Sequence, residues 1–318
     1  MNKKYILLKV ALIVLLYVAV VNVISLYNYN KLSASSALKN WKILERSGSD
    51  ISFYLPLQNK RYAILKMDPK KEVLIRAASF SYSLSKIAYV SNTRKGFYVY
   101  AVNPTDATDR KLLFPNPKGY VEKLTWSPDG KKIAFVGKVE PKEEPEFDKN
   151  DPTTWTPRYN SLYSYDMDTK SIQLLVNEGV REISNQCWSL DSKKIVYENI
   201  KGNIYIYDFD LNTSDLFIEK ADCATWSPNG KWIAYAQGKV KEENYFIMSP
   251  DKTQKELLIK RANLWQNIRL IRSVMGYLIW SPDSQYVYYD RDVGIILDAE
   301  QPRPFIMNVA TRKEYAIK

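Results

Sequence analysis

Apolar and polar residues alternate in short runs along most of this chain, which is the pattern of half-buried β-strands. Five of these runs share one arrangement: an aromatic residue, a serine, a polar turn and then an apolar stretch. The five segments are residues 80–89, 126–135, 188–197, 226–235 and 280–289. In the clearest copy the turn reads Ser127-Pro128-Asp129-Gly130, where proline presets φ at the second position and glycine is favoured at the fourth. Each segment therefore predicts a β-hairpin.

A second alternating run and a short final apolar run follow each hairpin, separated by a polar turn that often contains threonine. Four antiparallel strands per repeat make a propeller blade. The motif aromatics are spaced 46, 62, 38 and 54 residues apart, near the roughly 40–50 residues of a blade. An atypical upstream unit, with strands expected at residues 51–55, 62–67 and 72–75, brings the count to six. The sequence predicts an all-β fold, a six-bladed β-propeller of four-stranded antiparallel blades over residues 45–318.

The N-terminus carries a different pattern. Residues 5–27 are apolar apart from Lys9 and Asn22, and a helix of this length crosses a hydrocarbon core of about 30 Å. The rival interpretation is a signal peptide cleaved near Ser35-Ser36-Ala37. The apolar run ends well before that site, however, and it exceeds the roughly 7–15 residues typical of signal peptides. We predict a cytoplasmic stub and one transmembrane α-helix in residues 1–30, in contact with membrane lipid, and a linker over residues 31–44.

The orientation in the membrane is less constrained by the sequence, because lysine and arginine residues lie on both sides of the apolar run. We expect the N-terminus inside and the propeller on the outer face of a bacterial cell membrane. The low cysteine content, two in 318 residues, suits an exported protein.

Composition limits the chemistry. The chain has 46 Lys+Arg against 35 Asp+Glu, a net charge of +11, but the positive residues are spread along it, so we expect no nucleic-acid partner. There is no histidine, which excludes Ser-His-Asp and Cys-His nucleophiles and histidine-bound metals. We predict no catalytic residues, no metal site and no cofactor. Cys187 and Cys223 are expected to be buried free thiols, although a disulfide between neighbouring blades stays open.

The mouth of the central channel is where propellers usually bind ligands. Residues four positions before each motif aromatic are expected near the start of the innermost strands. They are Arg76, Glu122, Ser184 and Asp222, with Gly276 in the last repeat. These residues form a mixed-charge rim that suits a peptide or a sugar and specifies no reaction.

An acidic, proline-rich insert over residues 138–158 is the most distinctive segment, and we predict that it is an extended loop. A solvated surface loop explains it, and so does a partner-binding loop, because exposed aromatics on a rigid scaffold are typical of interfaces. The candidate contact residues are Glu143, Glu144, Phe147, Asp148 and Trp155. The motif tryptophans are expected to pack between blades. These four are Trp126, Trp188, Trp226 and Trp280.

The repeated Trp-Ser-Pro-Asp-Gly-Lys-x-Ile-Ala-Phe/Tyr motif resembles the repeat of TolB-type, WD-repeat-like β-propellers over residues 76–290. The chain departs from it at Leu190, which replaces proline, and at Ser192 and Ser284, which replace glycine. The resemblance implies a propeller that acts through protein contacts in envelope complexes.

Three functions follow as expectations. The first is a membrane-tethered, non-catalytic interaction scaffold whose partner is an envelope protein. The second is an extracytoplasmic propeller that binds a polysaccharide or small ligand. The third is a degenerate relative of hydrolases in which a propeller precedes the catalytic domain, although no Gly-x-Ser-x-Gly motif follows the repeats here.

Overall fold

The computed structural model describes residues 38, 41–47, 50–66, 74–93, 96–116, 119–139, 160–238, 244–260, 274–291 and 303–317. The predicted anchor and all five candidate contact residues of the insert lie outside these ranges. Within them, no helix combines the length and the apolar character of a membrane span.

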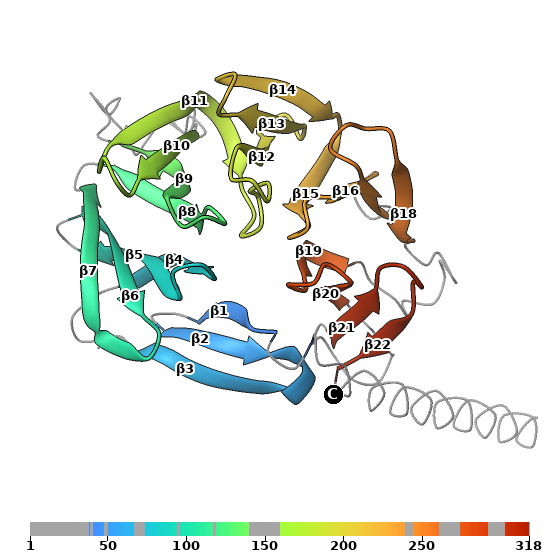
Figure 1. Cartoon of the computed structure of the whole chain (residues 1–318), viewed down its shortest axis with the longest axis horizontal. Helices are drawn as coiled ribbons and strands as arrows, with labels where there is room; N and C mark the ends of the chain where they lie inside the picture. The colour runs from blue at the N-terminus through green and yellow to red at the C-terminus, as the bar shows by residue number, and fades with distance from the viewer. Residues whose placement is uncertain are drawn as a thin grey trace, which may run out of the picture.

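The described chain is built almost wholly of antiparallel strands, which form sheets arranged around a common centre (Figure 1). This arrangement confirms the all-β propeller. The only helical element in the described ranges is the 3-10 turn η1 (Pro56–Gln58). The innermost strand of each sheet faces the centre, and the last strand lies at the periphery.

Five sheets follow one another along the described chain. The first holds β1 (Ile43–Ser47), β2 (Asp50–Leu55) and β3 (Lys60–Lys66). The second holds β4 (Leu74–Ser81), β5 (Lys86–Thr93), β6 (Gly96–Asn103) and β7 (Asp106–Asn116). The third holds β8 (Tyr120–Trp126), β9 (Lys132–Lys138), β10 (Asn160–Asp166), β11 (Ile172–Glu182), β12 (Lys194–Asn199), β13 (Ile204–Asp208) and β14 (Thr213–Ile218). The fourth holds β15 (Ala221–Trp226), β16 (Ile233–Gln237), β17 (Asn244–Met248) and β18 (Lys255–Ile259). The fifth holds β19 (Val274–Trp280), β20 (Tyr286–Arg291), β21 (Arg303–Asn308) and β22 (Glu314–Ala316).

The prediction of six separate four-stranded blades differs from these sheets. Three sheets of the described chain have four strands, the first has three, and β8 to β14 form one sheet of seven. The seven-stranded sheet arises because β11 continues to Glu182 and pairs with β12, placing Glu182 opposite Glu198. The segment before the third motif aromatic forms no strand and contributes one bridge, Trp188 to Ile195.

The bounds of the first unit also differ from those predicted from the sequence. The strand expected at residues 72–75 is not its last strand, because Leu74 and Ile75 begin β4 of the next sheet. Conversely, β1 starts at Ile43, inside the predicted linker. Leu38 and Trp41 also belong to that linker, yet they are 0% and 1% exposed. They pack with residues of the last sheet and help to close the ring.

The motif turns are held by their own side chains, as the turn chemistry of the sequence indicates. In the first full copy, the Ser127 hydroxyl donates to Asp129 Oδ1 at 2.6 Å and accepts from the Lys132 backbone N–H at 2.9 Å. The same pair of bonds recurs at Ser189 and Ser281. The motif aspartates are thus engaged in shaping their hairpins.

The two serines that replace the turn glycine connect one turn to another. Ser192 Oγ accepts from the Asp129 backbone N–H at 3.2 Å, and Ser284 Oγ accepts from the Asn229 N–H at 2.9 Å. Both serines have φ of 60°, in the left-handed region that usually favours glycine. A hydrogen bond between turns therefore offsets part of the conformational cost at these departures from the motif.

Candidate functional site

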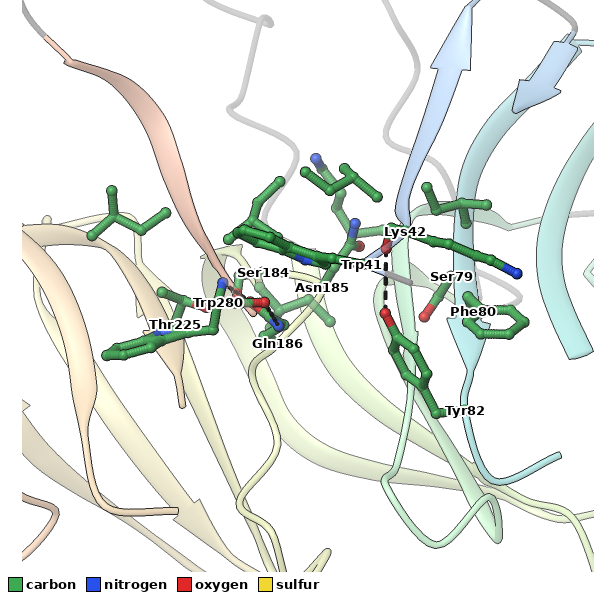
Figure 2. Close-up of a pocket in the computed structure, with 16 residues that line it drawn as sticks. Trp41, Lys42, Ser79, Phe80, Tyr82, Ser184, Asn185, Gln186, Thr225 and Trp280 are labelled. Carbon is green, nitrogen blue, oxygen red and sulfur yellow. Dashed lines mark hydrogen bonds between the residues drawn. The ribbon is translucent and has the colours of Figure 1, made fainter. Parts of the chain in front are cut away.

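A cavity of about 260 Å³ lies among the inner strands. Residues 41–44 of the first sheet line it, together with the ends of β4 and β19, Lys123 of β8 and Thr225 of β15. A segment that follows β11, Ile183–Gln186, reaches the same cavity; we call it the central segment. Figure 2 shows these side chains converging from strands far apart in sequence. The cavity is the candidate functional site.

Hydrogen bonds fix the central segment to three other strands. The Thr125 hydroxyl of β8 donates to the Asn185 carbonyl at 2.9 Å, and the Trp226 N–H of β15 donates to the Gln186 carbonyl at 2.6 Å. The Gln186 side chain donates to the Trp280 carbonyl at 3.1 Å and accepts from the Trp280 N–H at 2.8 Å. This segment therefore takes the place of a regular inner strand and forms a fixed wall of the cavity.

Three buried polar atoms at the cavity have no hydrogen-bond partner among the described residues: Ser184 Oγ, Thr225 Oγ1 and Trp280 Nε1. Their residues are 5%, 0% and 1% exposed. Buried polar groups are nearly always satisfied in folded proteins, so three unpartnered groups in one place indicate atoms available to a ligand or to water.

Aromatic rings and two lysines complete the lining. Trp41 and Phe80 supply apolar walls, and the Tyr82 hydroxyl donates to the Lys42 carbonyl at 3.3 Å. Lys42 and Lys123 bring positive charge to the rim, although Lys123 also forms a 3.0 Å ion pair with Glu182. Such a lining suits a ligand that has both an apolar part and a negative group.

Only one of the predicted channel-mouth residues lies at this cavity. Ser184 lines it, whereas Arg76 is exposed and does not. Glu122 accepts a hydrogen bond from Asn160 at 2.8 Å, and Asp222 adjoins the Cys223 thiol.

The physical reason is a β-bulge in every regular inner strand. The pairing shifts register between Ile75 and Ala78, between Val121 and Lys123, and between Asp222 and Thr225. A bulge adds a residue and interrupts the alternation along the strand, so counting back from the motif aromatic does not by itself say which way a side chain points. The lining residues lie instead directly before motif aromatics, at Ser79, Thr225 and Ile279. In these copies that position holds a small or β-branched residue, and this pattern in the sequence could have indicated the lining residues.

The motif tryptophans Trp126, Trp188, Trp226 and Trp280 are 1–5% exposed. Trp188 and Trp226 belong to one apolar cluster that joins β12–β14 to β15 and β16. The candidate contact residues Glu143, Glu144, Phe147, Asp148 and Trp155 lie outside the described residues. Within the described chain, no three acidic or cysteine side chains are placed to hold a metal ion.

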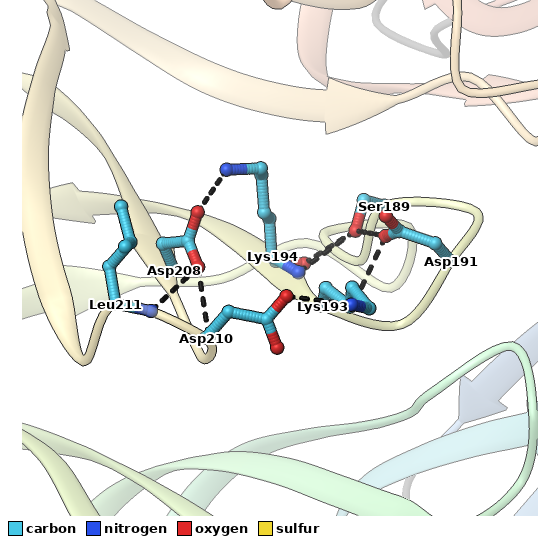
Figure 3. A network of polar contacts seen from close by, with 7 residues as sticks. All are labelled: Ser189, Asp191, Lys193, Lys194, Asp208, Asp210 and Leu211. Carbon is cyan, nitrogen blue, oxygen red and sulfur yellow. Dashed lines mark hydrogen bonds and ion pairs between the residues drawn. The ribbon is translucent and has the colours of Figure 1, made fainter.

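A separate polar network lies in the unit that contains Trp188 (Figure 3). The Lys194 ammonium donates to Asp208, and the backbone N–H groups of Asp210 and Leu211 donate to the same carboxylate at 2.9 and 3.1 Å. The bond from Lys194, together with these N–H groups, holds the Asp208 pKa below its ordinary value.

The lowered pKa predicts an acid-sensitive contribution to stability. A carboxyl whose folded pKa is depressed stabilises the fold above its unfolded pKa of about 3.9, and this contribution is lost as the pH falls through the folded pKa. We expect Asp208→Asn to lower the free energy of unfolding at pH 7. On acidification, the variant should then lose less of this free energy than the wild type does. Urea unfolding at pH 7 and pH 3 measures both quantities. Asp168→Asn, at an exposed turn position, is the control, and equal pH dependence in wild type and D208N would contradict the prediction.

Cys187 and Cys223 are free in the structure, one buried and one half-buried. Burial raises the pKa of both thiols well above the ordinary range, and the carboxylates of Asp222 and Glu198 raise that of Cys223 further. Because the thiolate is the reactive form, we expect both cysteines to react with a disulfide reagent at pH 8 at least about a hundredfold slower in the native chain than in guanidinium. Rapid labelling of Cys223 in the native chain would contradict this prediction.

No protein-family model matches the sequence, and no curated protein sequence matches it either. Comparison with solved structures finds similar folds. TolB from Acinetobacter baumannii superposes with a TM-score of 0.60 at 17% identity, over 86% of this chain and 62% of that one. A TolB-type protein from Agrobacterium tumefaciens superposes with a TM-score of 0.60 at 16% identity, over 86% of this chain and 90% of that one. An oligogalacturonate lyase in complex with manganese superposes with a TM-score of 0.58 at 12% identity, over 88% of this chain and 74% of that one. The chain thus spans less than two thirds of the A. baumannii protein, and these superpositions show a common fold alone.

Proposed function

We propose that this chain is a non-catalytic β-propeller that binds a protein partner at the bacterial cell envelope and is tethered to the membrane by residues 5–27. The similarity to TolB structures supports a propeller that works through contacts. The lack of histidine in the sequence supports the absence of a histidine-dependent reaction. The apolar N-terminal run supports the tether. In this proposal the N-terminus is inside and the propeller outside.

The observation that carries the proposal is the construction of the cavity. Its walls come from the first sheet, β4, β8, β15, β19 and the central segment, so a ligand held there contacts most of the ring at once. The unpartnered buried groups of its lining residues are hydroxyls and an indole N–H, which hydrogen-bond without supplying a base. The arrangement therefore favours recognition over reaction.

A finer assignment concerns the repeat. The group β12–β14, with the Trp188 bridge, is a fourth unit whose inner strand has become the central segment. Its motif turn at Ser189 has the same hydrogen bonds as the turn at Ser127, which supports this assignment. The ring then has six units, two of them incomplete at the centre.

In-cell crosslinking tests the proposed function. With a C-terminal tag on the full chain, we expect one envelope protein to be recovered in stoichiometric amount from solubilised membranes. Recovery is compared with a chain that lacks residues 140–156, which tests the insert as a second contact. Exclusive recovery of cytoplasmic proteins would refute the outer location, and consistent recovery of no protein would refute the scaffold function.

Binding of an acidic glycan is the second candidate. The aromatic walls, the unpartnered hydroxyls and the two lysines of the cavity favour it, since sugars stack on aromatic rings and carboxylates pair with ammonium groups. Calorimetry with oligogalacturonate and with a neutral oligosaccharide of equal length distinguishes the candidates. Selective binding of the acidic sugar, lost in Lys42→Glu, would favour this function over the scaffold.

A further inference from the structure

In the described ranges, the first sheet has no strand at the position that lies innermost in the other regular sheets. Its strand β2 corresponds to β13, because both carry a tyrosine that donates to an asparagine five residues later. Tyr54 donates to Asn59 at 3.1 Å and Tyr207 to Asn212 at 2.5 Å. Both asparagines are left-handed, with φ of 47° and 54°. Since β13 is the third strand of its unit, β2 is a third strand as well.

The pairing of the preceding strands supports the same alignment. Ile43 of β1 lies opposite Tyr54, just as Ile195 of β12 lies opposite Tyr207. Strand β1 is therefore the second strand of its unit, and in the second sheet the equivalent strand β5 pairs on its inner side with β4. Among the described residues, β1 pairs with β2 alone. Within the described part of the chain, its inner edge is therefore unpaired.

The candidate cavity lies along this open edge. Residues 41–44 line it, together with Ser79 and Phe80 of β4 and Ile279 and Trp280 of β19. A free strand edge presents backbone N–H and C=O groups that accept another strand. The unpartnered groups of Ser184, Thr225 and Trp280 lie at the same cavity.

The charge at the cavity defines the chemistry of the occupant. Lys42 and Lys123 both line it, and since Lys123 pairs with Glu182 at 3.0 Å, Lys42 contributes most of the positive charge. Residues 28–37, which precede the first sheet, contain one lysine and no acidic residue, so they do not complement these charges. We propose that an extended segment of a partner protein, carrying acidic side chains, pairs with β1 and completes the first sheet. This inference rests on the proposed function and specifies how the partner binds.

A synthetic inner strand is the direct probe. The peptide has the sequence of Ala221–Trp226 with serine in place of Cys223, so it carries one aspartate and one tryptophan. We expect it to bind the full chain in detergent micelles, by fluorescence anisotropy, and to slow hydrogen exchange of the amides of residues 43–47. The double variant Lys42→Glu, Lys123→Glu should weaken binding at least tenfold. Lys201→Glu, in the exposed turn between β12 and β13, should not weaken it.

Hydrogen exchange in β20 and β21 reports that each variant remains folded. Saturable binding without protection of residues 43–47 would overturn the inference. The inference would also be overturned if the peptide did not bind and the amides of residues 43–47 were already protected from exchange. A segment of the same chain, such as residues 292–302, would then occupy the place of the inner strand. An envelope partner crosslinked in cells at a site remote from β1 would leave the proposed function intact and refute the added strand. Peptide binding to β1 without recovery of any partner in cells would leave the added strand intact and refute the proposed function.

Discussion

Replacing Trp41 with alanine is expected to lower the free energy of unfolding by about 3–5 kcal/mol, the cost typical of removing a buried tryptophan. The side chain is 1% exposed and lies edge-on to Tyr288 of β20, with ring centroids 6.4 Å apart. Ile306 of β21 and Ile317 complete the cluster. The indole therefore joins the first sheet to the last, and its loss opens the seam at which the ring closes.

Urea denaturation followed by circular dichroism measures this effect. Tyr62→Ala is the matched control, because Tyr62 lies in the same sheet but is 50% exposed, and we expect a change within about 0.5–1 kcal/mol. Hydrogen exchange should also rise in β1 and in β20–β22 more than in β8–β11. A loss below about 1 kcal/mol for Trp41→Ala would show that other contacts hold the seam.

The hairpins were predictable because their structure is local. In the turns at Ser127, Ser189 and Ser281 a hydroxyl, an aspartate and a nearby N–H satisfy one another within five residues. Such chemistry depends on residue types at fixed short spacing, which a sequence displays directly. Repetition of the motif at blade spacing then implied the propeller.

The candidate site was not predictable in the same way, because it depends on how separate units meet. The bulge near Cys223 leaves no mark in the alternation of residue types, yet it shifts the pairing of β15 with β16 between Asp222 and Thr225. Trp41 lies in a segment without a motif, so nothing in its neighbourhood indicates that it packs against Tyr288, nearly 250 residues later. The central segment is a third case. It follows β11, whose last residues pair with β12, and its partners become apparent only once three sheets are placed around it.

These differences concentrate at the centre of the ring. The outer strands follow the repeat, while among the described residues the central segment forms no strand and β1 pairs with β2 alone. Deviations from a local rule are expected at functional positions, because binding requires groups that the repeat does not supply. The cavity lies between these two altered positions.

Replacing Gln186 with alanine is expected to cost about 2–3 kcal/mol of unfolding free energy, because it leaves two backbone groups of Trp280 without their partner. The amide spans 94 residues of sequence and fixes the central segment to β19. Gln173→Ala, at an exposed position on β11, is the control and should change stability by less than about 0.5 kcal/mol. Thermal unfolding of both variants gives the comparison. Equal stabilities would mean that water replaces the amide, whereas a selective loss in Gln186→Ala establishes that this side chain holds the inner wall of the cavity in place.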